Sequence, residues 1–469
     1  MSTRSIAQSA RNQPVRLRRY SGSTLVNLRY RKIQKLVAIF FLLLLTEGVF
    51  RKWLLNGIQQ PLLFIRDPIL LWIYIEYARV PRSKMPNWAV AWGAAALLFI
   101  LLTAVQATLI LTPALVFMLG LRSYIAYVPL AFIIAEVFDE FALGRFVKLS
   151  LMCSLPVAVL VAGQFFSPVG SPINKGLIDG TRGIFLVADG IVRPYGPFTF
   201  VLGQSTYASM MVAFVLIAWE KRSVYKIGMA LLVSATVAVT VMGALSGART
   251  FFGGAILVVL AYLLASLSGG RPTQGLSRII FVVLLSAVFF FTFIVIFPTS
   301  FSAMSSRQVQ AEHAEGSTLA RGLSMFTQVG QSISSAPPFG HGIGAGSNAG
   351  AFISSGGTAG DWTLGEYEWP RIVQELGPFA GILFIAFRVG LSALLALKAF
   401  HANRRARDPA ALTLFGFSGY LLLTAQVVGQ NQMLSFCWLT VGITMAFANC
   451  AHPESHSNAR GGIHGQIRP

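Results

Sequence analysis

The sequence predicts an all-α polytopic membrane protein of about twelve transmembrane helices, and three observations carry this prediction. The 469-residue chain is 55% hydrophobic but only 12% charged, about half the charge of a typical soluble domain. Its apolar residues form runs long enough to cross a bilayer, which takes roughly 20 residues. Its basic residues give a net charge of +20 and lie between those runs. Orientation in a membrane explains this placement better than nucleic-acid binding does.

Twelve apolar runs are candidate spans, and a long polar stretch separates the ninth from the tenth. The fourth run is too long for one upright helix and contains Arg122. It is therefore either one tilted helix or a re-entrant piece followed by a span. The twelve runs are 34–50, 61–78, 88–105, 109–137, 146–165, 198–219, 227–245, 251–267, 279–297, 377–397, 410–428 and 433–449.

Basic residues orient this set, because the cytoplasmic loops of membrane proteins are enriched in Lys and Arg. The tail before Leu36 carries nine of them, so we expect it in the cytoplasm. Alternation then places five further basic segments on the same side. Those segments are 79–84, 145–148, 221–226, 271–278 and 398–407.

Five regions follow from this topology. They are a basic cytoplasmic tail (1–33), helices one to nine (34–297) with an outer loop at 167–197, a large outer loop (298–376), helices ten to twelve (377–449) and a disordered cytoplasmic tail (450–469). The large loop is too long for a simple connection, and long structured loops usually carry function.

Several kinds of site are argued against by the sequence. Cys153, Cys437 and Cys450 lie in or at apolar runs and do not suggest a disulfide framework or a zinc site. The chain has no GxxxxGK[ST] or HExxH motif, which argues against an ATP-driven pump. The segment 344–349 formally fits GxGxxA, but it follows no predicted strand. We therefore expect no cofactor and no metal.

Three arginines at the outer boundary are candidates for binding an anion. Arg249 lies in SGART at 246–250, where its planar fork would suit a phosphate. The alternative, slightly favoured by the sequence alone, is an arginine that reaches the interface and ends a helix. Arg193 precedes the sixth run, and Arg321 opens an amphipathic stretch that would lie on the membrane or cap a cavity. Each alone is more often a surface charge, but together they would clamp a diphosphate.

The end of the large loop begins with a glycine-rich turn, PPFGHGIGAG at 337–346. Such a turn allows a ligand to approach the backbone closely, although a plain flexible turn explains it equally well. His341 within it is a candidate base, but a lone histidine in a loop is usually polar surface.

The last part of this loop combines acids with a tryptophan and an arginine. Its members are Glu366, Glu368, Trp369, Arg371 and Glu375. A carboxylate near an apolar boundary has a raised pKa and can act as a general base. A tryptophan beside carboxylates also suits a sugar ring. The alternative is an interfacial tryptophan anchor with ordinary surface acids.

Charged residues also lie early in the chain. Glu47, Arg51 and Lys52 end the first run, and Arg66 and Asp67 lie within the second. An Arg–Asp pair at this depth should face protein or a cavity. We favour a structural lock between helices over part of a path for lipid headgroups.

With these features on the page, the chain resembles the O-antigen ligase and polymerase family of bacterial envelope glycan enzymes. The twelve-run pattern with its long loop carries this resemblance, together with SGART, which is similar to the family's SGSRT. RPYGPF at 193–198, PPFGHGIG at 337–344 and ELGPFAG at 375–381 add to it. The similarity extends from about residue 53 to residue 447.

The resemblance implies a GT-C-like protein of the bacterial inner membrane, with both termini cytoplasmic and the large loop periplasmic. The family transfers glycans from undecaprenyl diphosphate without nucleotide or metal. Arg249 and Arg321, with Arg193, would hold the diphosphate. The implied partners are the lipid-linked glycan, membrane lipid, a flippase and a chain-length regulator, with no nucleic acid.

One departure bears on the reaction. The ligases carry a histidine about eleven residues before the glycine that opens helix ten, and this chain has Glu366 there. This favours a polymerase, with Glu366 or Glu368 as the catalytic base. Trp369, Arg371 and His341 would then contact the glycan.

The expected function is polymerisation of undecaprenyl-diphosphate-linked repeat units of an O-antigen or exopolysaccharide. The alternatives are an O-antigen ligase and a transporter or flippase component for polysaccharide. A transporter predicts charged residues through the middle of several helices and often inverted repeats. Here the polar residues gather at the outer ends and in the loop, which favours an enzyme.

Overall fold

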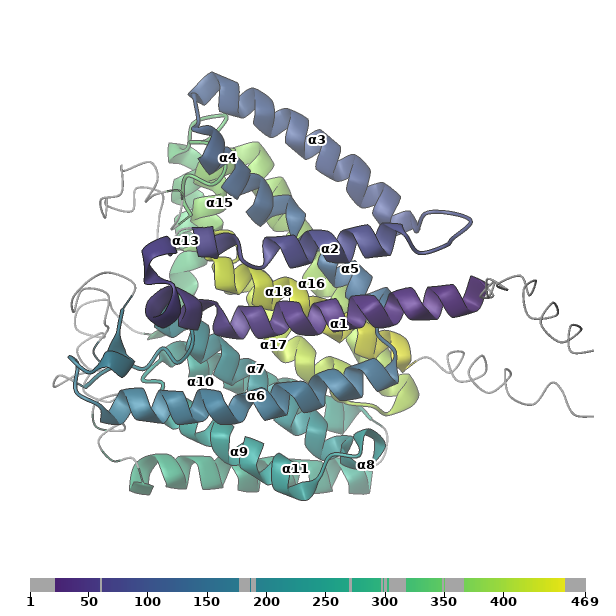
Figure 1. Cartoon of the computed structure of the whole chain (residues 1–469), viewed down its shortest axis with the longest axis vertical. Helices are drawn as coiled ribbons and strands as arrows, with labels where there is room; N and C mark the ends of the chain where they lie inside the picture. The colour runs from purple at the N-terminus through teal and green to yellow at the C-terminus, as the bar shows by residue number, and fades with distance from the viewer. Residues whose placement is uncertain are drawn as a thin grey trace, which may run out of the picture.

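The computed structural model describes residues 22–59, 61–176, 186, 191–269, 272–296, 298, 302, 318–347, 350 and 367–451. Within these residues the regular structure is helical (Figure 1). The one pairing of extended backbone in the described part is an isolated antiparallel bridge between Leu186 and Val192. The predicted all-α class is therefore confirmed for these residues.

Nine helical segments of the described chain are long and apolar enough to cross a membrane, so the protein is a multi-pass membrane protein. Two shorter apolar helices, Met229–Ala244 and Ala410–Thr424, correspond to two more of the predicted runs. The run at 61–78 instead forms a short 3-10 turn, Pro61–Phe64, and the twelve-residue helix Asp67–Ala78. The total of twelve spans stays a prediction.

The helices follow one another along the chain with short connections. They are α1 (Gly22–Val49), η1 (Phe50–Leu54), η2 (Asn56–Ile58), η3 (Pro61–Phe64), α2 (Asp67–Ala78), α3 (Asn87–Ile110), α4 (Ala114–Leu121), η4 (Arg122–Ala126), α5 (Val128–Val137), α6 (Glu140–Phe166), η5 (Pro172–Asn174), α7 (Val201–Glu220), α8 (Arg222–Tyr225), α9 (Met229–Ala244), α10 (Arg249–Ser268), α11 (Pro272–Phe291), η6 (Thr292–Ile296), α13 (Thr318–Ser335), α15 (Glu368–Leu376), α16 (Pro378–Ala406), α17 (Ala410–Thr424) and α18 (Asn431–Cys450).

The fourth predicted run forms one helical segment, Ala114–Val137, rather than a re-entrant piece and a separate span. Its middle turn, η4, is a π-helix that begins at Arg122. A π-turn adds one residue to a helical turn and so changes which side chains face the protein. Arg122, Ser123 and Tyr124 are all buried as a result.

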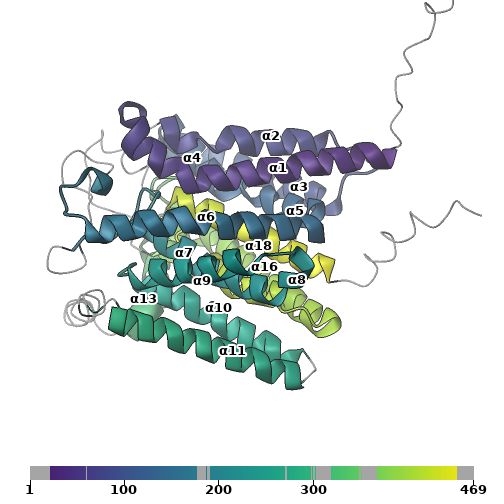
Figure 2. The ribbon, with the colours of Figure 1, turned by 60° about the horizontal axis from the view of Figure 1, so that its bottom comes forward.

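The helices pack around α7 and α18, which are almost entirely buried. α18 packs against α5 and α17, and α7 packs against α9, α10 and α17. α3 and α11 lie at the edges of the bundle and are mostly exposed (Figures 1 and 2). Since the flanks of a membrane protein face lipid, exposed apolar side chains on these two helices are expected.

The bundle has two different ends. α1 begins and α18 finishes at one end, on the right of Figure 1, which we call the terminal end. The opposite end carries η1–η3, the α9–α10 turn, α13 and α15, and we call it the loop end.

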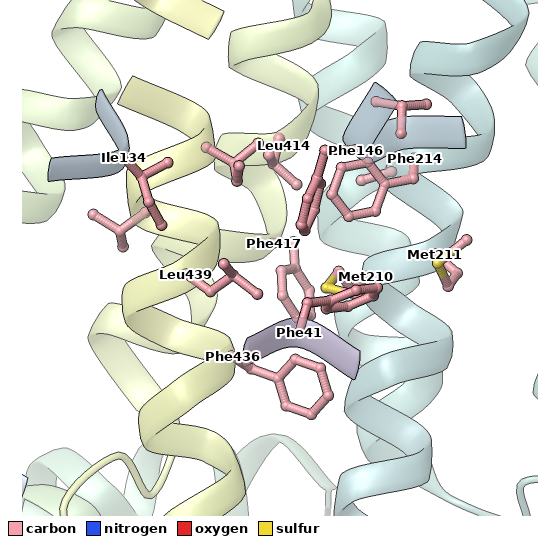
Figure 3. Close-up of a cluster of buried hydrophobic side chains, with 14 of the residues drawn as sticks. Phe41, Ile134, Phe146, Met210, Met211, Phe214, Leu414, Phe417, Phe436 and Leu439 are labelled. Atoms are coloured by element: carbon pink, nitrogen blue, oxygen red, sulfur yellow. The ribbon is translucent and has the colours of Figure 1, made fainter. Parts of the chain in front are cut away.

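Large apolar side chains fill the centre where α1, α6, α7 and α18 meet (Figure 3). Phe146 lies 5.0 Å from Phe41 and 5.9 Å from Phe214, measured between ring centroids. Glycines allow the closest helix contacts, as is common in membrane bundles. A methyl group on Gly416 of α17 would lie 2.7 Å from the Leu257 carbonyl oxygen of α10.

Candidate functional site

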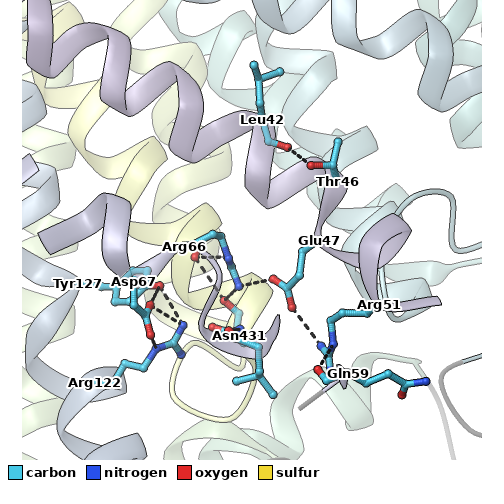
Figure 4. A network of polar contacts seen from close by, with 12 residues as sticks. Leu42, Thr46, Glu47, Arg51, Gln59, Arg66, Asp67, Arg122, Tyr127 and Asn431 are labelled. Atoms are coloured by element: carbon cyan, nitrogen blue, oxygen red, sulfur yellow. Dashed lines mark hydrogen bonds and ion pairs between the residues drawn. The ribbon is translucent and has the colours of Figure 1, made fainter. Parts of the chain in front are cut away.

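Buried charges join helices α1, α2 and α18 at the loop end (Figure 4). The Glu47 carboxylate lies 3.0 Å from Arg51 and 2.8 Å from Arg66. Arg66 also donates to the Asn431 carbonyl oxygen and to the Ser435 hydroxyl. Since an ionised side chain at membrane depth must find partners, these contacts explain how the arginine is tolerated.

Asp67 has a different set of partners. It accepts from Arg122 Nε at 2.6 Å and Nη2 at 3.0 Å, and from the Tyr127 hydroxyl at 2.6 Å. The sequence grouped Arg66 with Asp67 as one pair, and this is wrong. Successive side chains point in different directions around a helix, so each of the two reaches a different neighbour. The expected lock between helices is present, but it is built from two separate pairs.

The segment that carries Arg193 is fixed by residues from two other elements. Lys52 of η1 donates to the carbonyl oxygens of Gly196, at 3.2 Å, and Phe198, at 2.7 Å. Gln164 of α6 accepts from the backbone amides of Tyr195 and Gly196. Arg193 itself is half-buried just before this turn.

Arg249 is the first residue of α10, at the loop end, and it is half-buried. The preceding turn is closed by Ser246, which donates to Gly243 O and accepts from Ala248 N. Gly247 has a φ of +56°, a conformation that favours glycine. This turn therefore places an arginine at the positive end of a 20-residue helix, where anions are stabilised.

The predicted amphipathic stretch is a helix, α13, and Arg321 lies in its first turn. The side chain of Arg321 lies outside the described part of the structure, as does all of Glu366. α13 packs against α15 through Phe326, whose ring lies 5.0 Å from that of Trp369. The Trp369 indole donates to the carbonyl oxygen of Leu423, at the end of α17.

The same end of α17 lies near the start of α10. The two helices are antiparallel, with Gly416 against the α10 backbone at Leu257 and Tyr420 beside Gly254. Continuing this register brings the end of α17 level with Arg249. A series of contacts thus runs from α13 through α15 and α17 to α10.

Glu368 is buried and ion-paired. Its carboxylate accepts from Arg388 Nη1 at 2.7 Å and from the Val428 amide at 2.8 Å, and Arg371 lies 4.0 Å away. The alternative that this cluster contains ordinary surface acids is therefore wrong for Glu368. A lone arginine in the apolar run 377–397 was the signal for Arg388, because such a residue needs a partner.

Glu375 is also buried, and it binds the glycine-rich turn. It accepts from the amides of Gly344, at 3.2 Å, and Gly346, at 2.7 Å, and from the Tyr124 hydroxyl at 2.8 Å. Burial raises the pKa of Glu375 to about 7, although the hydrogen bond from Tyr124 opposes this. The glycine run was predicted to approach a ligand, but the anion at these two amides is a carboxylate of the chain itself.

The remaining predicted residues differ in exposure. His341 is exposed, and its backbone amide donates to the Gln374 carbonyl oxygen. Trp369 is half-buried, whereas Arg371 is buried. Among the residues that the structure describes, no group of three His, Cys, Asp or Glu side chains is placed to hold a metal ion.

Comparison of the chain with protein-family models, curated proteins and solved structures found no match. The structure thus establishes a multi-pass helical membrane protein with buried charges at one end. A family assignment rests on the resemblance of its motifs.

Proposed function

We propose that this protein is a membrane glycosyltransferase that polymerises lipid-diphosphate-linked oligosaccharide repeats at the outer face of a bacterial inner membrane. One observation carries the proposal. The helices that begin with the predicted anion-binding residues, α10 with Arg249 and α13 with Arg321, are connected at the loop end through Trp369 and the end of α17. The resemblance of SGART and the other motifs supports the same function.

In the proposed reaction, a sugar hydroxyl of one repeat attacks the anomeric carbon of another. The bond from that carbon to the diphosphate breaks, and the configuration inverts. Arg249 and Arg321 stabilise the negative charge on the leaving diphosphate, and Arg193 adds a third cation. A carboxylate takes the proton from the attacking hydroxyl.

Of the two candidate bases, we propose Glu366. The Glu368 carboxylate already accepts from Arg388 and the Val428 amide, which favours a role in holding α15 in place. Trp369 and His341 are at least partly exposed and suit a glycan. Arg371 is buried beside Glu368, which favours packing over sugar contact.

The test replaces Arg249 by Ala in cells that make the polymer, with Arg249→Lys as the conservative variant. Arg222, an exposed arginine of α8 at the terminal end, provides the matched control as Arg222→Ala. Loss of one group that stabilises the transition state lowers turnover on the order of 100-fold to 1,000-fold. We expect polymer to disappear in Arg249→Ala while lipid-linked single repeats accumulate outside.

Other outcomes select the alternatives. Polymer of normal length that is no longer joined to its acceptor would indicate a ligase. Repeats that stay on the cytoplasmic side would indicate a flippase. Normal polymer in Arg249→Ala would contradict the proposal.

A further inference from the structure

Lys52 is a lysine with no solvent exposure in a membrane helix, and the reaction as proposed above does not use it. We infer that Lys52 is a positioning residue, which holds the turn Tyr195–Phe198 and thereby sets where Arg193 lies at the loop end. The inference rests on the proposed function, since it gives Arg193 an anion to bind.

The contacts of Lys52 converge on this one turn. Nζ donates to Gly196 O at 3.2 Å and to Phe198 O at 2.7 Å. It also lies 3.7 Å from the centroid of the Tyr195 ring and 4.3 Å from that of Trp53. Two carbonyl oxygens and the faces of two aromatic rings are attractive surroundings for an ammonium group. Three of these four partners belong to residues 195–198.

A second observation, independent of the lysine, shows the same segment held against α1. Gly48 lies one helical turn before Lys52, and a methyl group there would be 2.2 Å from Pro197 O and 2.6 Å from Phe198 C. Only a glycine leaves room for the turn at this distance. The backbone of α1 therefore rests directly on the backbone of the turn.

Gln164 holds the turn from α6. Its Oε1 accepts from Tyr195 N at 3.1 Å and Gly196 N at 2.8 Å, and its Nε2 donates to Gly196 O at 3.3 Å. Gly196 has a φ of +56°, so the chain reverses sharply here. With contacts from both sides, the turn has little freedom to move, and Arg193 is two residues from its start.

The chemistry of Lys52 points to more than packing. Burying a charged amine is costly, and an apolar side chain of similar length would fill the same space without that cost. The acceptors of Lys52 in the described part of the chain are neutral carbonyl oxygens. Its positive charge therefore also adds to the potential that attracts an anion to Arg193.

The test uses the purified full-length protein in lipid vesicles, with undecaprenyl diphosphate as the probe. Its dissociation constant is measured for wild type, Lys52→Met, Arg193→Ala and the double variant. We expect each single change to weaken binding about tenfold, the effect of losing one hydrogen bond to a charged group. Because Lys52 acts through Arg193, the double variant should bind no more weakly than Arg193→Ala alone.

Two results would overturn the inference. One is binding by Lys52→Met within twofold of wild type, and the other is a double variant whose two losses multiply. If Lys52→Met does not fold, Gln164→Leu decides, because it loosens the same turn and leaves the lysine in place. Unchanged binding by Gln164→Leu would then contradict the role of the turn.

Arg249→Ala in the same assay separates this inference from the proposed function. Loss of binding in Arg249→Ala with normal binding in Lys52→Met overturns the positioning role alone. Normal binding in Arg249→Ala contradicts the diphosphate site itself.

Discussion

The two ends of the bundle hold their charged residues in different ways. At the terminal end, ion pairs join the ends of helices and remain partly exposed. Lys221 links Glu140, at 2.8 Å, with Asp408, at 2.6 Å, and these carboxylates keep 32% and 20% of their side-chain surface exposed. At the loop end, Glu47, Glu368 and Glu375 are buried. Water can take over a lost partner at the first end but not at the second.

This difference bears on function. A partly exposed ion pair contributes little and tolerates movement, so it serves to connect helix ends. A buried charge is kept only where hydrogen-bonding groups are fixed around it. The loop end therefore has the rigid polar geometry that a binding site requires, and the terminal end does not.

The largest effect on stability is expected for Arg388→Met. This change leaves the Glu368 carboxylate buried without the guanidinium that lies 2.7 Å away. Removing one partner of a buried ion pair costs about 3–5 kcal/mol. The free energy of unfolding in detergent measures the loss. The double variant Arg388→Met/Glu368→Gln is the control, and it should recover much of the stability because no unpaired charge remains.

A smaller effect, which depends on pH, is expected for Glu375→Gln. The pKa of Glu375 is about 7 in the folded protein, against 4.5 for an ordinary glutamate. The folded state therefore holds its proton more tightly, so the stability from this group is full below pH 4.5. It is lost as the pH rises through 7, by about 3 kcal/mol in total. Glu375→Gln cannot titrate and should lack this loss.

The measurement is the free energy of unfolding of both proteins between pH 4.5 and pH 8. The wild-type value should fall relative to that of the variant across this range. Parallel curves would mean that the pKa of Glu375 is not raised, and the hydrogen bonds from Gly344 and Gly346 would then be those of an ordinary carboxylate.

The helices were largely predictable because long apolar runs in a membrane protein leave few alternatives to helix. The exception is 61–78, where Pro61 begins a separate 3-10 turn and Arg66 and Asp67 contact different helices. The run was counted as one span, but its first part is used to build the lock at the loop end.

The site was predictable as a set of segments but not as a set of contacts. Trp369 and Arg249 were found by residue type and position, and their elements are connected at one end of the bundle. The partners of Glu368 and Glu375 lie 20 or more positions along the chain, and residue type alone does not select among distant candidates. A glycine run and a glutamate in one loop were the available signal for the second contact.

The smallest effect is expected for Lys221→Met, which repeats at the terminal end the chemistry of Arg388→Met. Both changes replace a base by an apolar side chain and leave a carboxylate behind. Glu140 and Asp408 are partly exposed, so water replaces the lysine, and the cost should be about 1 kcal/mol or less. The two variants are measured together by unfolding in detergent. If Lys221→Met costs as much as Arg388→Met, exposure does not separate the two ends, and the rigidity argued for the loop end loses its basis.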